Sequence, residues 1–126
     1  MGNTYWILPE VASDKDDCSD LTTLYREVGK LDEVCREIGV TKLSEFVDSS
    51  GIAQDFDLDI PAVVSDPVDL IQTLKGIYHY LSGNNSYNEE VKNLLFGELD
   101  HAIEKASSYQ YVGKQVRLCL LPLIDC

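Results

Sequence analysis

Apolar side chains recur at every third or fourth position in several stretches of the chain, a spacing that places them on one face of a helix. The first stretch covers residues 21–38 and runs through Leu21, Leu24, Val28, Leu31, Val34 and Ile38. Gly29 lies inside this stretch, where it costs a helix interior about 1 kcal/mol relative to alanine. Two interpretations therefore stay open: one continuous helix, or an irregular lead-in followed by a helix from about Lys30 to a stop at Gly39.

A short second helix is predicted directly after this stop. Thr41 has the side chain of a helix cap, and Leu43, Phe46 and Val47 would face inward. The polar residues 48–51 would end the helix.

The clearest helix start is Asp66, a capping residue followed by Pro67 at the first helical position. The apolar stripe of this helix ends at Gly83. Ser86 and Glu89 then have the S-x-x-E spacing of a capping box, which predicts the start of a long last helix. The side chains that this last helix would turn inward are Val91, Leu94, Leu95, Leu99, Ile103 and Ala106.

Residues 4–8 and 114–121 have the aromatic, branched and alternating composition of short strands, and each is closed by a proline. A lone strand needs a partner, so we expect these two segments to pair antiparallel. A chain of 126 residues suits one domain, residues 1–126. The predicted fold class is mainly α, as an α+β variant: a helical bundle with a small two-stranded antiparallel sheet formed by the N- and C-terminal strands.

One short segment, QDFDLDIP at residues 54–61, alternates carboxylates with apolar side chains. Its carboxylates are Asp55, Asp57 and Asp59. Counted as a calcium loop, the segment reaches Asp66 as its last ligand, but Ile60 stands where that loop turns on a glycine. We therefore expect an extended segment with one face in the core and the three carboxylates in water. A weak cation site at Asp55, Asp57, Asp59 and Asp66 stays open as an alternative.

The overall charge narrows the classes of partner. Twenty-two acidic against ten basic residues give a net charge of −12, which repels nucleic-acid phosphates and anionic lipids and attracts basic proteins. We expect a basic protein partner, no nucleic acid and no membrane, with solubility alone as the alternative role of the charge. The chain has no apolar run long enough for a membrane span and no signal-peptide pattern, so we expect it in the cytoplasm.

Candidate chemistry is sparse along the chain. His79 and His101 fall on polar positions of two different helices, and the four cysteines have no metal-ligand spacing. Cys35 and Cys119 stand at positions where a thiol acts as a small hydrophobe. The sequence therefore predicts no catalytic residue, no metal site and no cofactor. Tyr80 leans toward the solvent side of its helix and would add an aromatic anchor to a docking surface.

Four segments resemble a small bacterial protein family of about this length that has no settled function: TYWILP, LDEVCREIGVTKLSEFV, SDPVDLIQTLKGIYHYL and VRLCLLPLIDC. Members of that family tend to carry an aromatic residue just before the Asp-Pro pair, where this chain has Val64 and Ser65. The resemblance implies a compact, mainly helical bacterial cytosolic domain and supplies no catalytic residue.

These observations favour a non-catalytic protein-interaction or inhibitory module, similar in charge and size to the immunity proteins that neutralise bacterial toxins. Its candidate partner-binding residues are Asp55, Asp57, Asp59 and Tyr80. The alternative is a small-molecule or cation-binding domain with its site between helices. The oligomeric state and the identity of the partner stay open.

Overall fold

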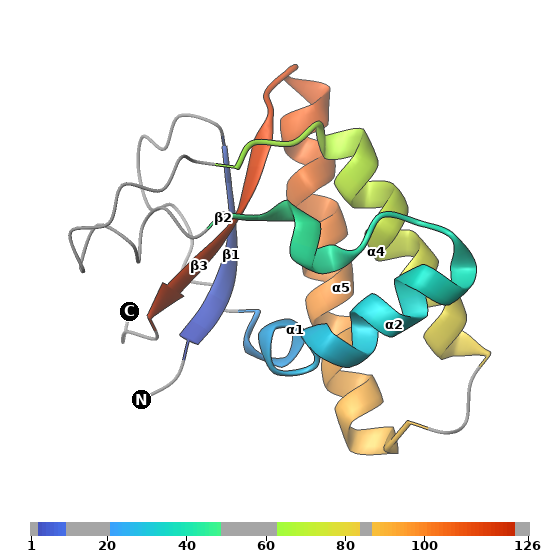
Figure 1. Cartoon of the computed structure of the whole chain (residues 1–126). Coiled ribbons are helices and arrows are strands. Elements are labelled where there is room, and N and C mark those ends of the chain that lie inside the picture. The colour runs from blue at the N-terminus through green and yellow to red at the C-terminus, as the bar shows by residue number, and fades with distance from the viewer. Residues whose placement is uncertain (1–2, 10–20, 49–62, 84–86, 123–126) are drawn as a thin grey trace.

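A computed structural model describes residues 3–9, 21–48, 63–83 and 87–122. The elements follow in the order β1 (Asn3–Pro9), α1 (Thr22–Arg26), α2 (Val28–Ile38), the 3-10 helix η1 (Leu43–Phe46), β2 (Val47–Asp48), α4 (Pro67–Ser82), α5 (Glu89–Tyr111) and β3 (Val116–Pro122). The described helices lie on one side of the strands, with α5 running behind α1 and α2 in the view of Figure 1. The fold is mainly α with a small sheet, as the sequence predicts.

The two terminal strands pair antiparallel, with register from Asn3 opposite Pro122 to Pro9 opposite Val116. This confirms the predicted sheet of the chain ends. A third strand was not predicted: β2 pairs parallel with β3 and gives the order β1-β3-β2. The described sheet is therefore three-stranded and mixed. Strand β2 was not predicted because two residues are too few to show the alternation by which a strand is recognised in sequence.

The stretch at residues 21–38 divides into two helices, although not at the glycine. The helical path breaks at Glu27, and Gly29 is inside α2. The segment before the break is itself helical, so neither interpretation of this stretch was fully right. Gly39 ends α2 as expected, in the left-handed conformation at φ 80°, with its N–H donating to the Cys35 carbonyl at 2.9 Å.

The next turn is a 3-10 helix that begins at Leu43, one residue later than a Thr41 cap would place it. The Lys42 N–H donates to the Glu45 carboxylate at 3.3 Å, while the Thr41 carbonyl accepts from the Thr73 hydroxyl at 2.8 Å. Leu43 and Phe46 are buried as predicted. Asp48, the second residue of β2, is also buried and does not belong to a polar helix stop.

Helix α4 begins as predicted, with the Asp66 carboxylate accepting from the Val68 N–H at 2.9 Å. Helix α5 is capped by Asn88, whose Oδ1 accepts from the amides of both Glu90 and Val91. The predicted cap, Ser86, lies outside the described residues. Leu94 is half exposed instead of inward. Adjacent helix positions differ by about 100° in direction, so the burial of Leu95 turns Leu94 away from the core.

The core lies between the sheet and the helices. Tyr5 and Ile7 of β1 and Val116 and Leu118 of β3 meet the apolar faces of the helices. Helices α4 and α5 pack along each other, with the rings of Tyr78 and Phe96 at a centroid distance of 4.7 Å. Leu70, Leu74, Ile77, Leu81, Leu95 and Leu99 are among the side chains that this packing buries completely or almost so.

Candidate functional site

The predicted docking residues fall in two different parts of the chain. Asp55, Asp57 and Asp59 lie outside the described residues. Tyr80 lies on α4, where it is half-buried, packs against the core and donates its hydroxyl to Glu37 at 3.3 Å. Tyr80 is therefore less open to a partner than its helical position predicts.

Of the four residues of the predicted cation site, only Asp66 lies in the described part of the chain. Asp66 is exposed, and one of its carboxylate oxygens caps α4. Within the described ranges, no three His, Cys, Asp or Glu side chains lie close enough together to hold a metal ion.

The two histidines do not share a pocket among the described residues. A shallow hollow of about 380 Å³ between α4 and α5 is lined by His79 with Lys75, Tyr78, Asp100 and Ile103. His101 is not part of this lining, and it is half-buried where the sequence predicts a surface position.

Cys35 and Cys119 are free thiols in buried positions. Cys35 packs in the apolar core as a small hydrophobe, as predicted, whereas Cys119 lies outside that core and donates to a carboxylate. Burial is the main cause that raises the pKa of both, and the pKa of Cys119 reaches about 11. A thiol is a nucleophile only as thiolate, so these two side chains do not supply one near neutral pH.

Cys119 belongs to a buried polar cluster on the face of the sheet that points away from the core. Arg117 and Cys119 alternate along β3 with Leu118, which faces the core. Arg117 Nη1 lies 3.1 Å from Asp48 Oδ2, and Cys119 Sγ lies 4.0 Å from the same oxygen. Asp48 is only 1% exposed, so this is a buried ion pair that ties β2 to β3.

Sequence reasoning missed this cluster because its members are far apart along the chain. Asp48 and Arg117 are separated by 69 positions. The available signal was Arg117 itself, a charge inside the otherwise apolar segment VRLCLL.

The buried protonated groups make stability sensitive to alkaline pH. Burial raises the pKa of Cys119 from 9.0 to about 11 and that of Tyr5 from 10.0 to about 12. Both groups are neutral when protonated, so their contribution is complete below the unfolded pKa and is lost as pH rises through the folded pKa. We expect the free energy of unfolding, measured by urea denaturation, to fall between about pH 9 and pH 12. Cys119→Ala and Tyr5→Phe should each make this decrease in the free energy of unfolding with pH less steep. The same pH dependence in the unmodified chain and in both variants would contradict the assignment of the decrease to Cys119 and Tyr5.

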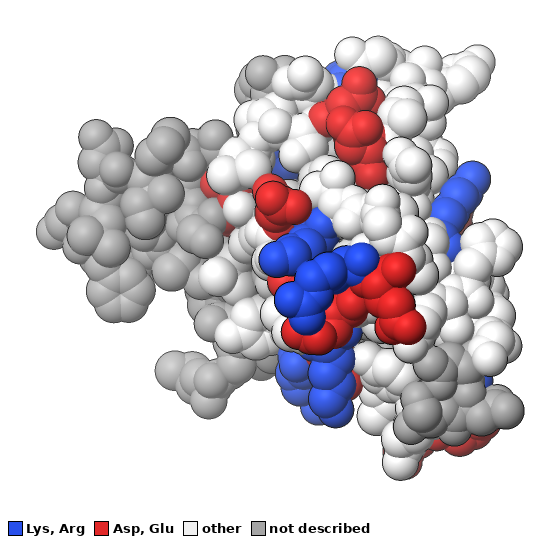
Figure 2. Space-filling model, turned by 45° about the vertical axis from the view of Figure 1, so that its right-hand side comes forward, with Lys and Arg blue, Asp and Glu red and all other residues white. Residues whose placement is uncertain are grey.

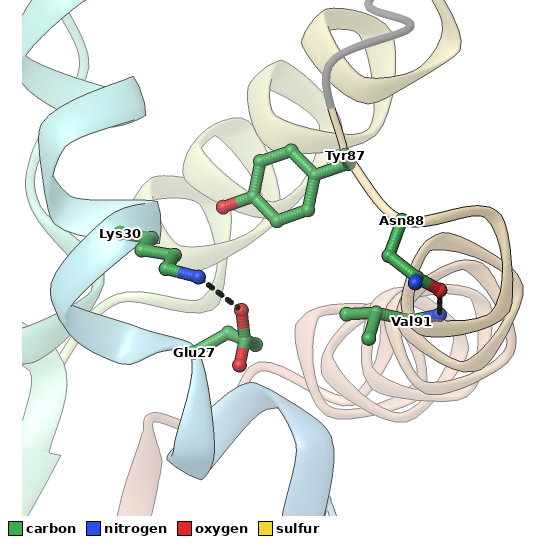
Figure 3. Close-up of a pocket in the computed structure, with 5 residues that line it drawn as sticks. All are labelled: Glu27, Lys30, Tyr87, Asn88 and Val91. Carbon is green, nitrogen blue, oxygen red and sulfur yellow. Dashed lines mark hydrogen bonds and ion pairs between the residues drawn. The ribbon is translucent and has the colours of Figure 1, made fainter.

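A second hollow combines polar groups from three parts of the fold. It has a volume of about 350 Å³ and lies where the α1–α2 junction approaches the start of α5 (Figure 3). Glu27 lies at that junction and Lys30 on α2, whereas Tyr87, Asn88 and Val91 come from the start of α5. Lys30 Nζ and Glu27 Oε1 are 3.7 Å apart, with the Glu27 side chain 20% exposed and that of Lys30 74% exposed.

The Tyr87 hydroxyl is the unusual group of this hollow. Its oxygen is buried, and no hydrogen-bond partner for it exists in the described part of the chain. An unsatisfied buried hydroxyl costs about 1–3 kcal/mol. Burial, followed by the negative charge of Glu27, raises the pKa of Tyr87, so the hydroxyl stays protonated and can donate.

The acidity of the chain is unevenly distributed. Figure 2 shows a face on which Lys and Arg side chains lie against Asp and Glu side chains without a uniform acidic surface. Residues 10–20, by contrast, contain one basic residue, Lys15, against a row of acids: Glu10, Asp14, Asp16, Asp17 and Asp20. Residues 49–62 contain Asp55, Asp57 and Asp59 and no basic residue at all. The excess negative charge is therefore concentrated in two short segments of sequence.

Comparisons with family models, curated proteins and solved structures found no match for the chain. The resemblance drawn from the four sequence segments stays a prediction. Among the described helices, none combines the length and the apolar character needed to cross a bilayer.

Proposed function

We propose that this chain is a non-catalytic binding module that engages a basic protein through its acidic segments, with Asp55, Asp57 and Asp59 as the central contacts. The observation that carries the proposal is the excess of acidic over basic residues in the sequence of residues 10–20 and 49–62. Among the described residues, Glu27 pairs with Lys30 and Glu33 with Arg36.

The uneven distribution of acidic residues affects which partners the chain attracts. A local excess of negative charge steers a basic partner toward one part of the surface and disfavours acidic competitors. Mixed surface charges largely cancel beyond about 8 Å at physiological salt, so they contribute little steering. The two segments in which acids most outnumber bases, residues 10–20 and 49–62, are therefore where selective docking of a basic protein would occur.

The finer role that we propose is inhibition of the basic partner, in the manner of immunity proteins. A small acidic domain inhibits a basic enzyme or toxin when it covers the positively charged surface that the partner uses. We place this action in the cytoplasm, which is supported by the free, buried thiols of Cys35 and Cys119.

Affinity capture from source lysate, carried out in parallel at low and high salt, tests the proposal. We expect one basic protein to be retained at low salt and released at high salt, since exposed charge pairs are screened by ions. Retention of acidic proteins, or equal retention of the same partner at both salts, would contradict a charge-driven interface.

A further inference from the structure

The hollow beside Tyr87 has the composition of a binding site for a small charged molecule. Its central feature is the buried Tyr87 hydroxyl, which lacks a hydrogen-bond partner among the described residues. Native proteins rarely leave such a group unsatisfied, because a buried hydroxyl usually bonds to protein, water or a ligand. Figure 3 shows the hydroxyl pointing toward the side of the hollow on which Lys30 and Glu27 lie.

The surrounding groups define what the hollow can bind. The protonated Tyr87 hydroxyl and the Lys30 ammonium are donors that suit a carboxylate. Asn88 uses its Oδ1 to cap α5, which leaves its NH₂ group on the side facing the hollow (Figure 3). Glu27 is an acceptor suited to an ammonium, and Val91 supplies an apolar wall.

We propose that this hollow binds a small zwitterion of the α-amino-acid type. The ligand carboxylate meets Tyr87, Lys30 and the Asn88 amide, its ammonium meets Glu27, and a short apolar side chain meets Val91. A volume of about 350 Å³ lies at the small end of the range for ligand pockets, which suits a molecule of this size.

Entry of the ligand exchanges one ion pair for two. The Glu27–Lys30 contact is long at 3.7 Å, and the Lys30 side chain is mostly exposed, so it can move away at little cost. Movement of Lys30 opens the path to the Tyr87 hydroxyl. Glu27 then pairs with the ligand ammonium and Lys30 with the ligand carboxylate, which keeps every charge compensated.

Titration of the full chain with L-alanine, followed by amide chemical shifts in NMR, tests the proposal. We expect saturable shifts at Lys30, Tyr87, Asn88 and Val91 at millimolar L-alanine. Lactate lacks the ammonium and ethylamine lacks the carboxylate, so each should bind at least about tenfold more weakly. The absence of saturable shifts, or equal binding of the three probes, would overturn the proposal.

Two tyrosine variants assign the binding to the buried hydroxyl. Tyr87→Phe removes the unsatisfied group but keeps the ring, so its urea midpoint should equal or exceed that of the unmodified chain, while L-alanine binding weakens about tenfold. Tyr80→Phe is the matched control, because it removes a hydroxyl that already has Glu37 as partner outside the hollow. Unchanged alanine binding in Tyr87→Phe would overturn the assignment. If Tyr87→Phe fails to fold, Glu27→Gln replaces it as the test. This variant removes the acceptor for the ligand ammonium, so it should also weaken L-alanine binding, and unchanged binding would overturn the proposal.

Discussion

Replacing Arg117 with methionine is expected to lower the free energy of unfolding by about 3–5 kcal/mol, because it removes the Arg117 cation from a buried carboxylate. Asp48 is 1% exposed, and Arg117 Nη1 lies 3.1 Å from its Oδ2. Asp48→Ala should cost less, about 3 kcal/mol, since the Arg117 side chain is 16% exposed and can still reach water. Urea denaturation followed by circular dichroism measures both variants.

The double variant Asp48→Ala with Arg117→Met distinguishes a charge effect from a packing effect. Without either charge, no buried carboxylate remains that has lost its Arg117 contact, so the double variant should be more stable than Arg117→Met alone. Additive losses would show that the two side chains act by packing, and a loss below about 1 kcal/mol in both single variants would contradict a buried ion pair.

Replacing Glu98 with alanine is expected to lower the free energy of unfolding by about 2–3 kcal/mol, because one carboxylate satisfies two backbone amides. Glu98 Oε2 accepts from the Thr23 N–H at 3.0 Å and Glu98 Oε1 from the Leu24 N–H at 2.9 Å. These amides open α1, whose preceding residue, Leu21, has no side chain that can cap. The carboxylate of α5 therefore caps a different helix and fastens it to the body of the fold.

The matched control for this change is Glu104→Ala, an exposed position on the same helix with the same change in charge and helix propensity. We expect it to shift the free energy of unfolding by less than about 0.5 kcal/mol. Hydrogen exchange should also be faster at Thr23 and Leu24 in Glu98→Ala alone. Equal losses in the two variants would mean that Glu98 acts only through charge or helix propensity.

Local signals in the sequence were sufficient to predict the helix ends and strands that are determined by residues close together in the chain. Asp66 and Pro67 predict the start of α4 because a capping carboxylate and the amide that it accepts from are two positions apart. Gly39 predicts the end of α2 because a left-handed residue suits glycine. The terminal strands were predicted from composition, and their pairing follows from the need of each for a partner.

Contacts between distant residues were not predictable in this way. The Glu98 cap joins positions 75 apart, and no local pattern marks a carboxylate that caps another helix. Strand β2 forms because β3 offers it an edge, so its two residues carried no signal of their own. The hollow at Tyr87 likewise forms where the α1–α2 junction packs near the start of α5, and this tertiary contact has no local signal in the sequence.

The break between α1 and α2 shows how tertiary contacts override a local preference. Gly29 was the expected weak point, yet the helical path breaks at Glu27. Glu27 is also the residue that turns toward Lys30 and the hollow (Figure 3). The position of the break therefore places the one carboxylate that the proposed zwitterion needs.

We propose that the acidic segments, and not the net charge alone, bind a basic partner. The most direct test measures the affinity of the captured partner for two charge-matched variants. One carries Asp55→Asn, Asp57→Asn and Asp59→Asn; the other carries Glu90→Gln, Asp100→Asn and Glu104→Gln at exposed positions of α5. We predict at least about tenfold weaker binding for the first variant and little change for the second. Equal weakening in both variants, or unchanged binding in the first with its fold intact, would contradict the claim.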